Sequence, residues 1–433
     1  MNLCVIGTGH VGLVTGACFA DLGHHVVCVD NNRKKIVSLK TGRVPCYEPG
    51  LEEIVRRNTS GKRLSFTDSI AEGVRHSEII FIAVGTPPMD SGEADLTGVE
   101  TVVRQIAQEM DGYRLVVEKS TVPVETGKQV QRTLKMSLRK KVPFDVASNP
   151  EFLREGSAIH DFMNPDRIVF GVESERAKQL LTALYKPLKV PLVVTDIASA
   201  ELIKHASNAF LATKISFINA IATLCERVGA DVEQVAHGMG LDPRIGPAFL
   251  RAGLGYGGFC LPKDIEAFLR IAEKRGYDFQ LLRAVKRINE DQRRLLVQRV
   301  EEQLWNVKGK SIGILGLAFK PNTDDLRFAP SLDVIEALSR AGAKVRAFDP
   351  QAMPAARKIL KGIRLAKDPY DLAKGSDCMV VLTEWNEFKD LDLRRIKKLM
   401  RQPVVVDGRN LYDPETLRKF GFRYSAVGRG RPE

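Results

Sequence analysis

The first thirty residues alternate between short apolar runs and one segment with helical spacing. Residues 3–6 are continuously apolar, as expected of a strand buried on both faces of a sheet. A segment with helical spacing follows the glycines at residues 7–12 and continues to Leu22, where Gly23 ends it. A second apolar run follows over residues 25–30. The order strand, helix, strand predicts a βαβ unit and therefore a parallel sheet.

Similar apolar runs continue the predicted parallel sheet at residues 79–84, 115–118, 144–147 and 167–172. Polar turn residues follow several of these runs, at residues 85–88, 120–123 and 149–155. Ligands of doubly wound sheets bind at the carboxyl ends of the strands. We therefore expect a Rossmann-like domain over residues 1–199, with its ligand near these turns.

The middle of the chain has a different pattern. Residues 200–227 contain neither proline nor glycine and are strongly apolar, which predicts a long helix that is buried on more than one side and ends at Gly229. Such a helix typically links domains or subunits. Lys204 and Asn208 are four residues apart and project from one face, either as functional groups or as a surface lysine with a helix-stabilising contact.

The strand and turn pattern begins again near residue 307. Apolar runs at residues 345–348, 378–382 and 404–406 end in polar turns, which indicates a second αβ domain over residues 307–433. This domain lacks a complete GxGxxG, so a second dinucleotide site is not expected. Lys320 and Arg409 follow strands and are candidates for binding a phosphate, or are ordinary surface charges.

Glycines between the first strand and the first helix form the motif Gly7, Gly9 and Gly12. Gly7 makes the tight turn, Gly9 lets a pyrophosphate approach the backbone, and Gly12 permits close packing of helix on strand. Asp30 ends the second strand and is placed to accept hydrogen bonds from both ribose hydroxyls. Its charge would repel a 2′-phosphate, so NAD is expected, although Arg33 leaves NADP open.

Residues 253–264 form a second glycine-rich segment, with glycines at 253, 255, 257 and 258. We interpret it as a loop whose backbone approaches a ligand closely, followed by a helix from Ile265. Cys260 lies where backbone N–H groups and Lys263 favour the thiolate, the form that attacks carbonyl groups. The alternative is a buried structural cysteine in a turn.

Composition excludes several classes of protein. The 433 residues have 44% hydrophobic and 27% charged residues, typical of a globular protein with two or three domains. No continuous apolar run approaches the length of a membrane span, and the first residues enter a strand without a signal peptide, so a cytoplasmic protein is expected. Seven cysteines without a Cys-x-x-Cys pair indicate neither a disulfide framework nor a metal site.

A formal net charge of +12 suits an anionic partner. The lysines and arginines are scattered along the chain, so nucleic acid is not expected as the partner. Small anionic ligands such as nucleotides fit at least as well.

Taken together, these motifs resemble those of the nucleotide-sugar 6-dehydrogenases, the UDP-glucose/GDP-mannose dehydrogenase family. The resemblance covers the whole chain through residues 7–12, 84–87, 120–123, 149–155, 257–264, 316–321 and 407–409, together with Lys204 and Asn208. It implies an NAD-binding domain, a central helical dimerisation region over residues 200–306, and a C-terminal domain that binds a UDP-sugar. The family oxidises a primary alcohol to a carboxylate in two NAD-dependent steps.

The resemblance also implies catalytic roles. Cys260 would capture the aldehyde as a thiohemiacetal, which the second oxidation turns into a thioester. Lys204 and Asn208 would donate hydrogen bonds to the oxygen that becomes negative. Asp264 and Thr121 would take part in proton transfer, with Thr121 positioning a water molecule. Glu151 would assist hydrolysis of the thioester.

Further contacts are implied for the cofactor and the substrate. Arg244 would be donated by the partner subunit of a homodimer, and Arg327 would contact the cofactor at the domain junction. The remaining cofactor positions are Val11, Lys35, Thr86, Thr121, Glu155 and Lys263. The remaining substrate positions are Glu151, Phe152, Leu153, Glu155, Phe249, Leu250, Gly253, Gly255, Tyr256, Gly257, Phe319, Lys320 and Arg409.

Three positions depart from the family pattern. Phe259 stands where close relatives often have Ser, Leu261 where they often have Phe, and Glu125 where a glycine is common. UDP-glucose is the substrate expected from residues 149–155, whereas GDP-mannose or a UDP-N-acetylhexosamine remains an alternative. A two-electron β-hydroxyacid dehydrogenase, which needs neither Cys260 nor a third domain, is a rival of another class. An NAD-sensing protein without catalysis is the remaining alternative.

Overall fold

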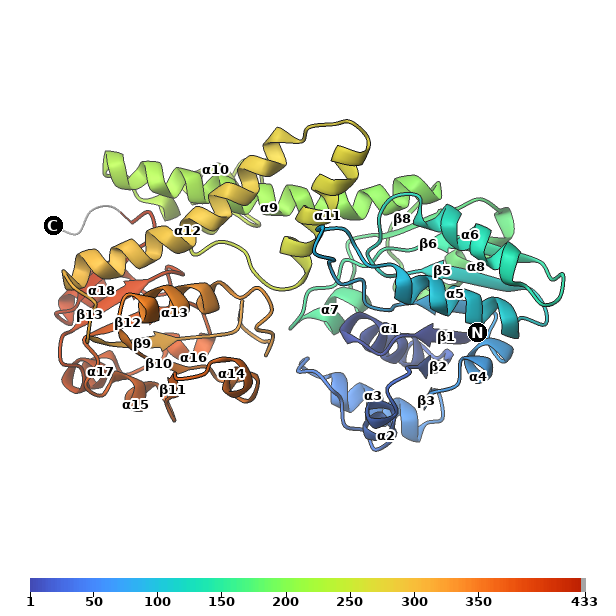
Figure 1. Ribbon diagram of the computed structural model, residues 1–433, viewed down its shortest axis with the longest axis horizontal. Helices are drawn as coiled ribbons and strands as arrows, with labels where there is room; N and C mark the ends of the chain where they lie inside the picture. The colour runs from blue at the N-terminus through green and yellow to red at the C-terminus, as the bar shows by residue number, and fades with distance from the viewer. Residues whose placement is uncertain (430–433) are drawn as a thin grey trace. The chain divides into compact units, whose positions relative to one another are not determined.

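The computed structural model describes residues 1–429 and divides into two compact units, each built on a largely parallel sheet (Figure 1). The first unit comprises Met1–Ser207 and Glu266–Tyr277. The second comprises Asn208–Ile265 and the chain from Asp278 onwards.

The first unit contains an eight-stranded sheet in the order β3-β2-β1-β4-β5-β6-β7-β8. Its central strand β1 pairs in parallel with β2 on one side and β4 on the other, with Val5 opposite Cys28 and Phe81. All residues of strand β4 are buried, as the apolar run in the sequence predicted. The strands are β1 (Asn2–Ile6), β2 (His25–Val29), β3 (Leu64–Thr67), β4 (Ile79–Ile82), β5 (Arg114–Glu118), β6 (Phe144–Ser148), β7 (Ile168–Val172) and β8 (Leu192–Thr195).

Helices cover both faces of this sheet. On one face Leu13, Val55 and Leu181 pack in a core with β1 and β4, and on the other face Val103 and Leu134 pack in a second core. The helices are α1 (His10–Asp21), α2 (Arg33–Lys40), α3 (Leu51–Ser60), α4 (Ile70–Arg75), α5 (Thr97–Glu109), α6 (Thr126–Ser137), α7 (Ala158–Met163), α8 (Glu175–Tyr185) and the 3₁₀ helix η1 (Lys186–Leu188).

Two features of this sheet differ from the expectation. Strand β7 pairs with β6 antiparallel, with Ala147 opposite Val172, so the expectation of a parallel strand at residues 167–172 was wrong. An apolar run shows that a strand is buried but not which way it points, because direction depends on the connection that precedes it. Strands β3 and β8 were not predicted, since both runs are short and Val193 and Val194 of β8 are exposed.

The second unit contains a six-stranded parallel sheet in the order β11-β10-β9-β12-β13-β14. Its strands are β9 (Ser311–Leu315), β10 (Lys344–Phe348), β11 (Arg364–Leu365), β12 (Cys378–Val381), β13 (Val404–Asp407) and β14 (Arg423–Ala426). Its helices after residue 306 are α13 (Pro330–Arg340), α14 (Met353–Ile359), α15 (Pro369–Ala373), α16 (Asn386–Lys389), α17 (Leu393–Leu399) and α18 (Pro414–Lys419). The expected second αβ domain is therefore present.

Four helices lie between the two sheets in sequence: α9 (Ile197–Val228), α10 (Val232–Gly240), α11 (Cys260–Lys274) and α12 (Gln280–Leu304). Within residues 1–429, α9 alone is long and apolar enough to cross a membrane by length and composition. It nevertheless buries Lys204, His205 and Asn219, polar side chains that are buried only when other protein groups pack against them. The expected fold, two Rossmann-like domains and a central helical region, is confirmed. The boundaries at residues 199 and 306 stay a prediction.

Candidate active site

The turn between β1 and α1 fits the pyrophosphate of a dinucleotide. Gly7 has a φ of +102°, and a Cβ on Gly12 would lie 1.9 Å from the Gly7 carbonyl oxygen, so the helix can approach the strand only with glycine there. Gly9 has open space in front of it, and no side chain caps the start of α1. The first N–H groups of the helix are therefore available to an anion. Val11, the second residue of α1, is half-buried.

Asp30 lies directly after β2, where the ribose was expected. Its Oδ2 accepts hydrogen bonds from the Thr8 N–H at 3.0 Å, the Thr8 hydroxyl at 2.7 Å and the Lys35 ammonium at 2.8 Å, and its Oδ1 accepts the Asn32 N–H. Burial opposes ionisation, but the hydrogen bonds from Lys35, Thr8 and Asn32 outweigh it and lower the pKa of Asp30 to about 2. The carboxylate is thus charged and able to repel a 2′-phosphate. Lys35, an expected cofactor residue, lies beside it, whereas Arg33 pairs with Asp68.

At the carboxyl ends of β5 and β6 the first unit buries an ion pair. The Lys204 ammonium lies 3.1 Å from Glu151 Oε1, and both side chains are 6% exposed. The other oxygen, Glu151 Oε2, accepts the Leu153 N–H at 2.6 Å. The centre of the Phe152 ring lies 3.8 Å from the Arg167 guanidinium carbon and 5.5 Å from the Lys204 ammonium nitrogen. Three residues expected around the substrate, at positions 151–153, are therefore brought together with Lys204.

A second buried lysine, Lys119, adjoins this pair and was not identified from the sequence. Its ammonium donates to the carbonyl and the side-chain oxygen of Asn149, which also accepts the Tyr185 hydroxyl. Burial and the neighbouring Lys204 lower the pKa of Lys119 to about 8, against the attraction of Glu151. A charged residue directly after a buried strand was the available signal in the sequence.

The first half of α9 is fixed to the loop that contains Thr121. Glu201 accepts the main-chain N–H groups of Glu125 and Gly127 at 2.6 and 2.7 Å, and a His205 ring nitrogen lies 2.8 Å from the Val122 carbonyl oxygen. Glu125 has a φ of +79°, so it keeps the left-handed turn that a glycine commonly makes in the family. The Thr121 carbonyl accepts the hydroxyl of the expected cofactor residue Thr86 at 2.9 Å.

In the second unit Cys260 is the first residue of α11 and is exposed. The expectation that the helix starts at Ile265 was wrong, because Pro262 is compatible with the first turn of a helix and does not delay it. Of the other cysteines, Cys46 is half-buried and the remaining five are buried. Cys260 is thus the accessible thiol of the chain, at a helix N-terminus that favours a thiolate.

One turn further along α11, Asp264 is buried and joins two expected site residues. Its Oδ2 accepts the Asn208 amide at 2.6 Å, and its Oδ1 lies 2.8 Å from the Lys263 ammonium. The Lys263 ammonium lies 5.8 Å from the centre of the Phe259 ring, and the guanidinium of Arg327 lies 4.3 Å from the same centre. The structure therefore groups Asn208, Lys263 and Asp264.

Two of the glycines before Cys260 lie directly against side chains of the second unit. A Cβ on Gly258, which has a φ of +78°, would lie 2.6 Å from the Phe319 ring, and one on Gly255 would lie 2.3 Å from Asn289 Oδ1. All four glycines of the segment are buried. The protein's own packing therefore requires glycine at these two positions. Asn289 on α12 accepts the Tyr256 N–H and donates to its carbonyl, which holds the loop in place.

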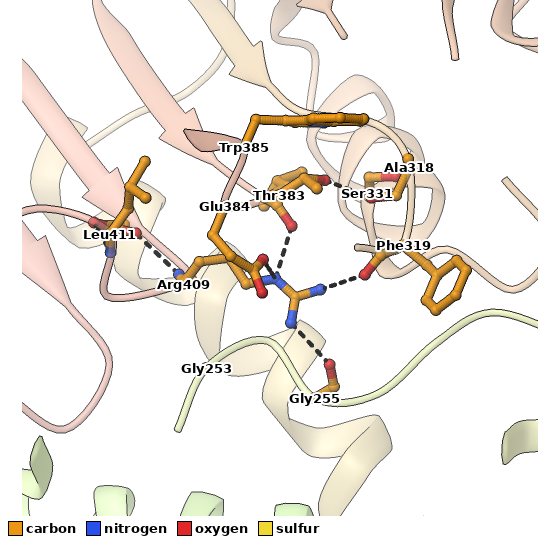
Figure 2. A network of polar contacts seen from close by, with 12 residues as sticks. Gly253, Gly255, Ala318, Phe319, Ser331, Thr383, Glu384, Trp385, Arg409 and Leu411 are labelled. Atoms are coloured by element: carbon orange, nitrogen blue, oxygen red, sulfur yellow. Dashed lines mark hydrogen bonds and ion pairs between the residues drawn. The ribbon is translucent and has the colours of Figure 1, made fainter. Parts of the chain in front are cut away.

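Arg409 follows β13 and contacts three main-chain carbonyls, as Figure 2 shows. Nε donates to Leu382 at 2.9 Å, Nη1 to Gly255 at 3.1 Å and Nη2 to Phe319 at 3.0 Å. The other expected phosphate ligand, Lys320, is half-buried next to Phe319 in the chain.

The remaining expected residues are more dispersed. Arg244 is 87% exposed and pairs with Asp242, and Arg327 pairs with Asp325. Phe249 is half-buried with a φ of +64°, and Leu250 is buried. Within residues 1–429 no group of three or more His, Cys, Asp or Glu is placed to hold a metal ion.

Comparison with known proteins decides the family. Three sequence models of the UDP-glucose/GDP-mannose dehydrogenase family match consecutive parts of the chain: the NAD binding domain at residues 1–189, the central domain at 198–291 and the UDP binding domain at 313–414. The chain belongs to this family. It is accordingly an NAD-dependent oxidoreductase, and the residues around Gly9 and Asp30 fit that cofactor.

Similar proteins support the same conclusion over the full length. A UDP-glucose 6-dehydrogenase of Bacillus subtilis is 50% identical over 99% of this chain and 93% of its own length. The structure of a UDP-glucose dehydrogenase from Pyrobaculum islandicum superposes with a TM-score of 0.93 at 43% identity, covering 98% of this chain and 97% of that one. A UDP-D-ManNAc dehydrogenase structure from Pyrococcus horikoshii has a TM-score of 0.88 at 30% identity and covers 99% of both chains.

Proposed function

We propose that this protein oxidises UDP-glucose to UDP-glucuronate in two NAD-dependent steps, with the intermediate bound covalently to Cys260. The main support for the proposal is the exposed thiol of Cys260 at the start of α11, one turn before the buried Asp264. The 50% identity with a UDP-glucose 6-dehydrogenase supports the choice of sugar nucleotide. Bound NAD supplies the hydride acceptor for both oxidations.

The chemistry assigned to Cys260 begins with an aldehyde. The first oxidation removes a hydride and a proton from the primary alcohol and leaves this aldehyde. The Cys260 thiolate then forms a C–S bond to the aldehyde carbon, whose oxygen takes up a proton to give a thiohemiacetal. The second oxidation removes a hydride from that carbon and the proton from its oxygen, which gives a thioester. Water attacks the thioester, the C–S bond breaks, and the thiolate and the carboxylate are released.

Other side chains are proposed to stabilise the negative charge on the substrate and to transfer protons. The Lys204 ammonium and the Asn208 amide donate to the substrate oxygen while it is negative. Asp264, already hydrogen-bonded to Asn208, takes up a proton, and Thr121 positions the water molecule. Glu151 assists hydrolysis of the thioester, and its contact with Lys204 keeps both side chains in a fixed orientation.

The UDP moiety is assigned to the second unit, where the UDP binding domain model matches. Lys320 supplies a cation for a phosphate at the end of the Gly316–Phe319 turn. Phe249, Leu250 and the loop before Cys260 line the sugar. Arg244, exposed at 87% in one chain, reaches the substrate of a partner subunit.

A panel of nucleotide sugars tests the choice of substrate. UDP-glucose with NAD is expected to give the highest kcat/KM, and GDP-mannose and UDP-N-acetylhexosamines much lower values. NADP in place of NAD is expected to be a poor cofactor, because the charged carboxylate of Asp30, which we assign to the ribose, repels a 2′-phosphate. Faster turnover of GDP-mannose or of a UDP-N-acetylhexosamine would contradict the assignment, and equal use of NADP would contradict the role of Asp30.

We also propose that the protein is a homodimer formed along α9. Phe210, Phe217 and Leu224 are spaced by seven residues on this helix and are 65%, 47% and 53% exposed, a stripe that a second copy would cover. Replacing Phe210 and Phe217 together by Asp is expected to give monomers in light scattering after size exclusion. Met136→Asp, at a residue that is 73% exposed on α6, is the control. A monomeric wild type at micromolar concentration, or a double variant of unchanged mass, would contradict the proposal.

We assign the protein to the cytoplasm. The support is the family match over residues 1–189, 198–291 and 313–414 and the buried polar residues of α9, the helix that by composition alone resembles a membrane span.

A further inference from the structure

Arg409 connects parts of the second unit that are far apart in sequence. Its guanidinium contacts the carbonyls of Leu382 after β12, Phe319 after β9 and Gly255 in the loop before Cys260. We propose that Arg409 is a positioning residue that couples the nucleotide-binding strand ends to the loop carrying the Cys260 thiol. The inference deepens the proposed function and rests on it for the role of Cys260.

The guanidinium is suited to this task because its N–H groups form a planar fork. Each of its three nitrogens donates to a different carbonyl, at 2.9, 3.1 and 3.0 Å, which uses three of the five donors of an arginine. Glu384 Oε2 lies 3.4 Å from Nε and balances the positive charge. A lysine has the same charge but presents its donors from one point, so it cannot make the three contacts together.

The segment that carries Arg409 is itself fixed. The buried carboxylate of Asp407 accepts the N–H groups of Arg409, Leu411 and Tyr412 and the Tyr424 hydroxyl. The Gly408 carbonyl accepts the Leu254 N–H at 2.8 Å. Two adjacent residues of one turn, Gly408 and Arg409, therefore hold the loop before Cys260 at residues 254 and 255.

The turn after β9 is equally well held. The Leu317 carbonyl accepts a hydrogen bond from Ser331. The carbonyls of Ala318 and Phe319 accept hydrogen bonds from Thr383 and Arg409, respectively (Figure 2). Asp349 Oδ2 accepts the N–H groups of Leu317 and Ala318, at 2.7 and 3.0 Å. Phe319 therefore has a fixed backbone.

Phe319 links this turn to the thiol loop. Its ring packs directly on Gly258, two residues before Cys260, and its carbonyl oxygen shares the Arg409 guanidinium with Gly255. Lys320, the proposed phosphate ligand, is the next residue. A nucleotide bound at this turn is thereby connected to the thiol through Arg409 and Phe319.

Hydrogen exchange of the protein without substrate or cofactor tests the inference. In Arg409→Ala, amide exchange in peptides covering residues 253–260 is expected to be about tenfold faster, because the Gly255 contact is lost. Arg409→Lys is expected to behave like Arg409→Ala. In steady-state kinetics with varied UDP-glucose and excess NAD, both variants are expected to have a lower kcat as well as a higher KM.

Two matched variants serve as controls. Arg346 is, like Arg409, 13% exposed and donates to two main-chain carbonyls, those of Lys374 and Asp371. Arg346→Ala is therefore expected to leave exchange at residues 253–260 unchanged. Lys320→Ala is expected to raise KM without changing that exchange. Unchanged amide exchange in β12 and β13 of the Arg409 variants verifies that the second unit remains folded. Arg409→Lys keeps the positive charge and is therefore the milder of the two substitutions.

The outcomes separate the inference from the proposed function. Wild-type exchange at residues 253–260 in both Arg409 variants, or full rescue by Arg409→Lys, would overturn the coupling while leaving the proposed reaction intact. A raised KM with an unchanged kcat, as a phosphate ligand alone predicts, would overturn the coupling in the same way. Faster exchange in both Arg409 variants, together with a wild-type protein that does not oxidise UDP-glucose, would support the coupling and refute the proposed function.

Discussion

Cys260→Ala is expected to lose UDP-glucuronate production by roughly three or more factors of ten, as removal of a catalytic nucleophile does. The second oxidation needs the thiohemiacetal, and alanine cannot form it. Binding of UDP-glucose should persist, because the proposed UDP contacts lie on Lys320 and the UDP binding domain and not on the thiol. Chromatographic assay of the uronate and calorimetric titration with UDP-glucose measure the two quantities.

Cys260→Ser tests the same step in a second way. An alkoxide is a much poorer leaving group than a thiolate, so the serine ester is expected to break down slowly and to appear as a sugar adduct in the intact mass. Cys46→Ser, at the half-buried thiol of the first unit, is the matched control and should show no adduct and normal turnover. A Cys260→Ala enzyme that makes the uronate at the normal rate would contradict the proposal that Cys260 carries the intermediate.

The second large effect is expected at Lys204. Lys204→Ala should lower kcat by about 10²- to 10³-fold, the usual cost of removing one donor to a developing oxyanion. It should also lower the free energy of unfolding by about 3–5 kcal/mol, because it leaves the Glu151 carboxylate buried without its 3.1 Å partner. The charge of Lys119 nearby offsets part of this loss. Steady-state kinetics and denaturant unfolding measure the two effects.

A double variant separates the two effects. Adding Glu151→Gln to Lys204→Ala removes the uncompensated charge, so stability should recover while kcat does not. Lys178→Ala is the control. The Lys178 side chain pairs with Glu175 and is 47% exposed, and such surface ion pairs contribute about 0–1 kcal/mol to the free energy of unfolding. A single Lys204→Ala variant with near-normal kcat would remove Lys204 from the catalytic group and leave it a structural partner of Glu151.

The positions and burial of most strands could be predicted from the sequence because apolar runs and glycine turns are local signals. The turn at Gly7 and Gly12 and the position of Asp30 follow directly from such a pattern. The direction of β7 could not be predicted, since nothing in residues 168–172 encodes which way the strand runs. Strand β8 has too little burial to leave a pattern.

The residues of the candidate active site were likewise predictable only where a local sequence pattern marks them. Cys260 and Lys204 carry distinctive chemistry and were singled out from their spacing and from the resemblance. Lys119 was missed, because its burial against Asn149 arises only when β5 and β6 lie side by side. The contacts of Arg409 with Gly255 and Phe319 join residues 154 and 90 positions apart, which no local pattern reveals. The glycines before Cys260 were interpreted as making room for a ligand, whereas Phe319 and Asn289 fill the space at two of them.

The amount of NADH formed per UDP-glucose consumed tests the central claim most directly. A reaction that passes through a Cys260 thioester to the carboxylate must transfer two hydrides for each sugar. Limiting UDP-glucose, excess NAD and absorbance at 340 nm, with the uronate quantified in the same sample, give the ratio. We predict two NADH per UDP-glucose and an equal amount of UDP-glucuronate; one NADH per UDP-glucose with an aldehyde product would contradict the proposed reaction.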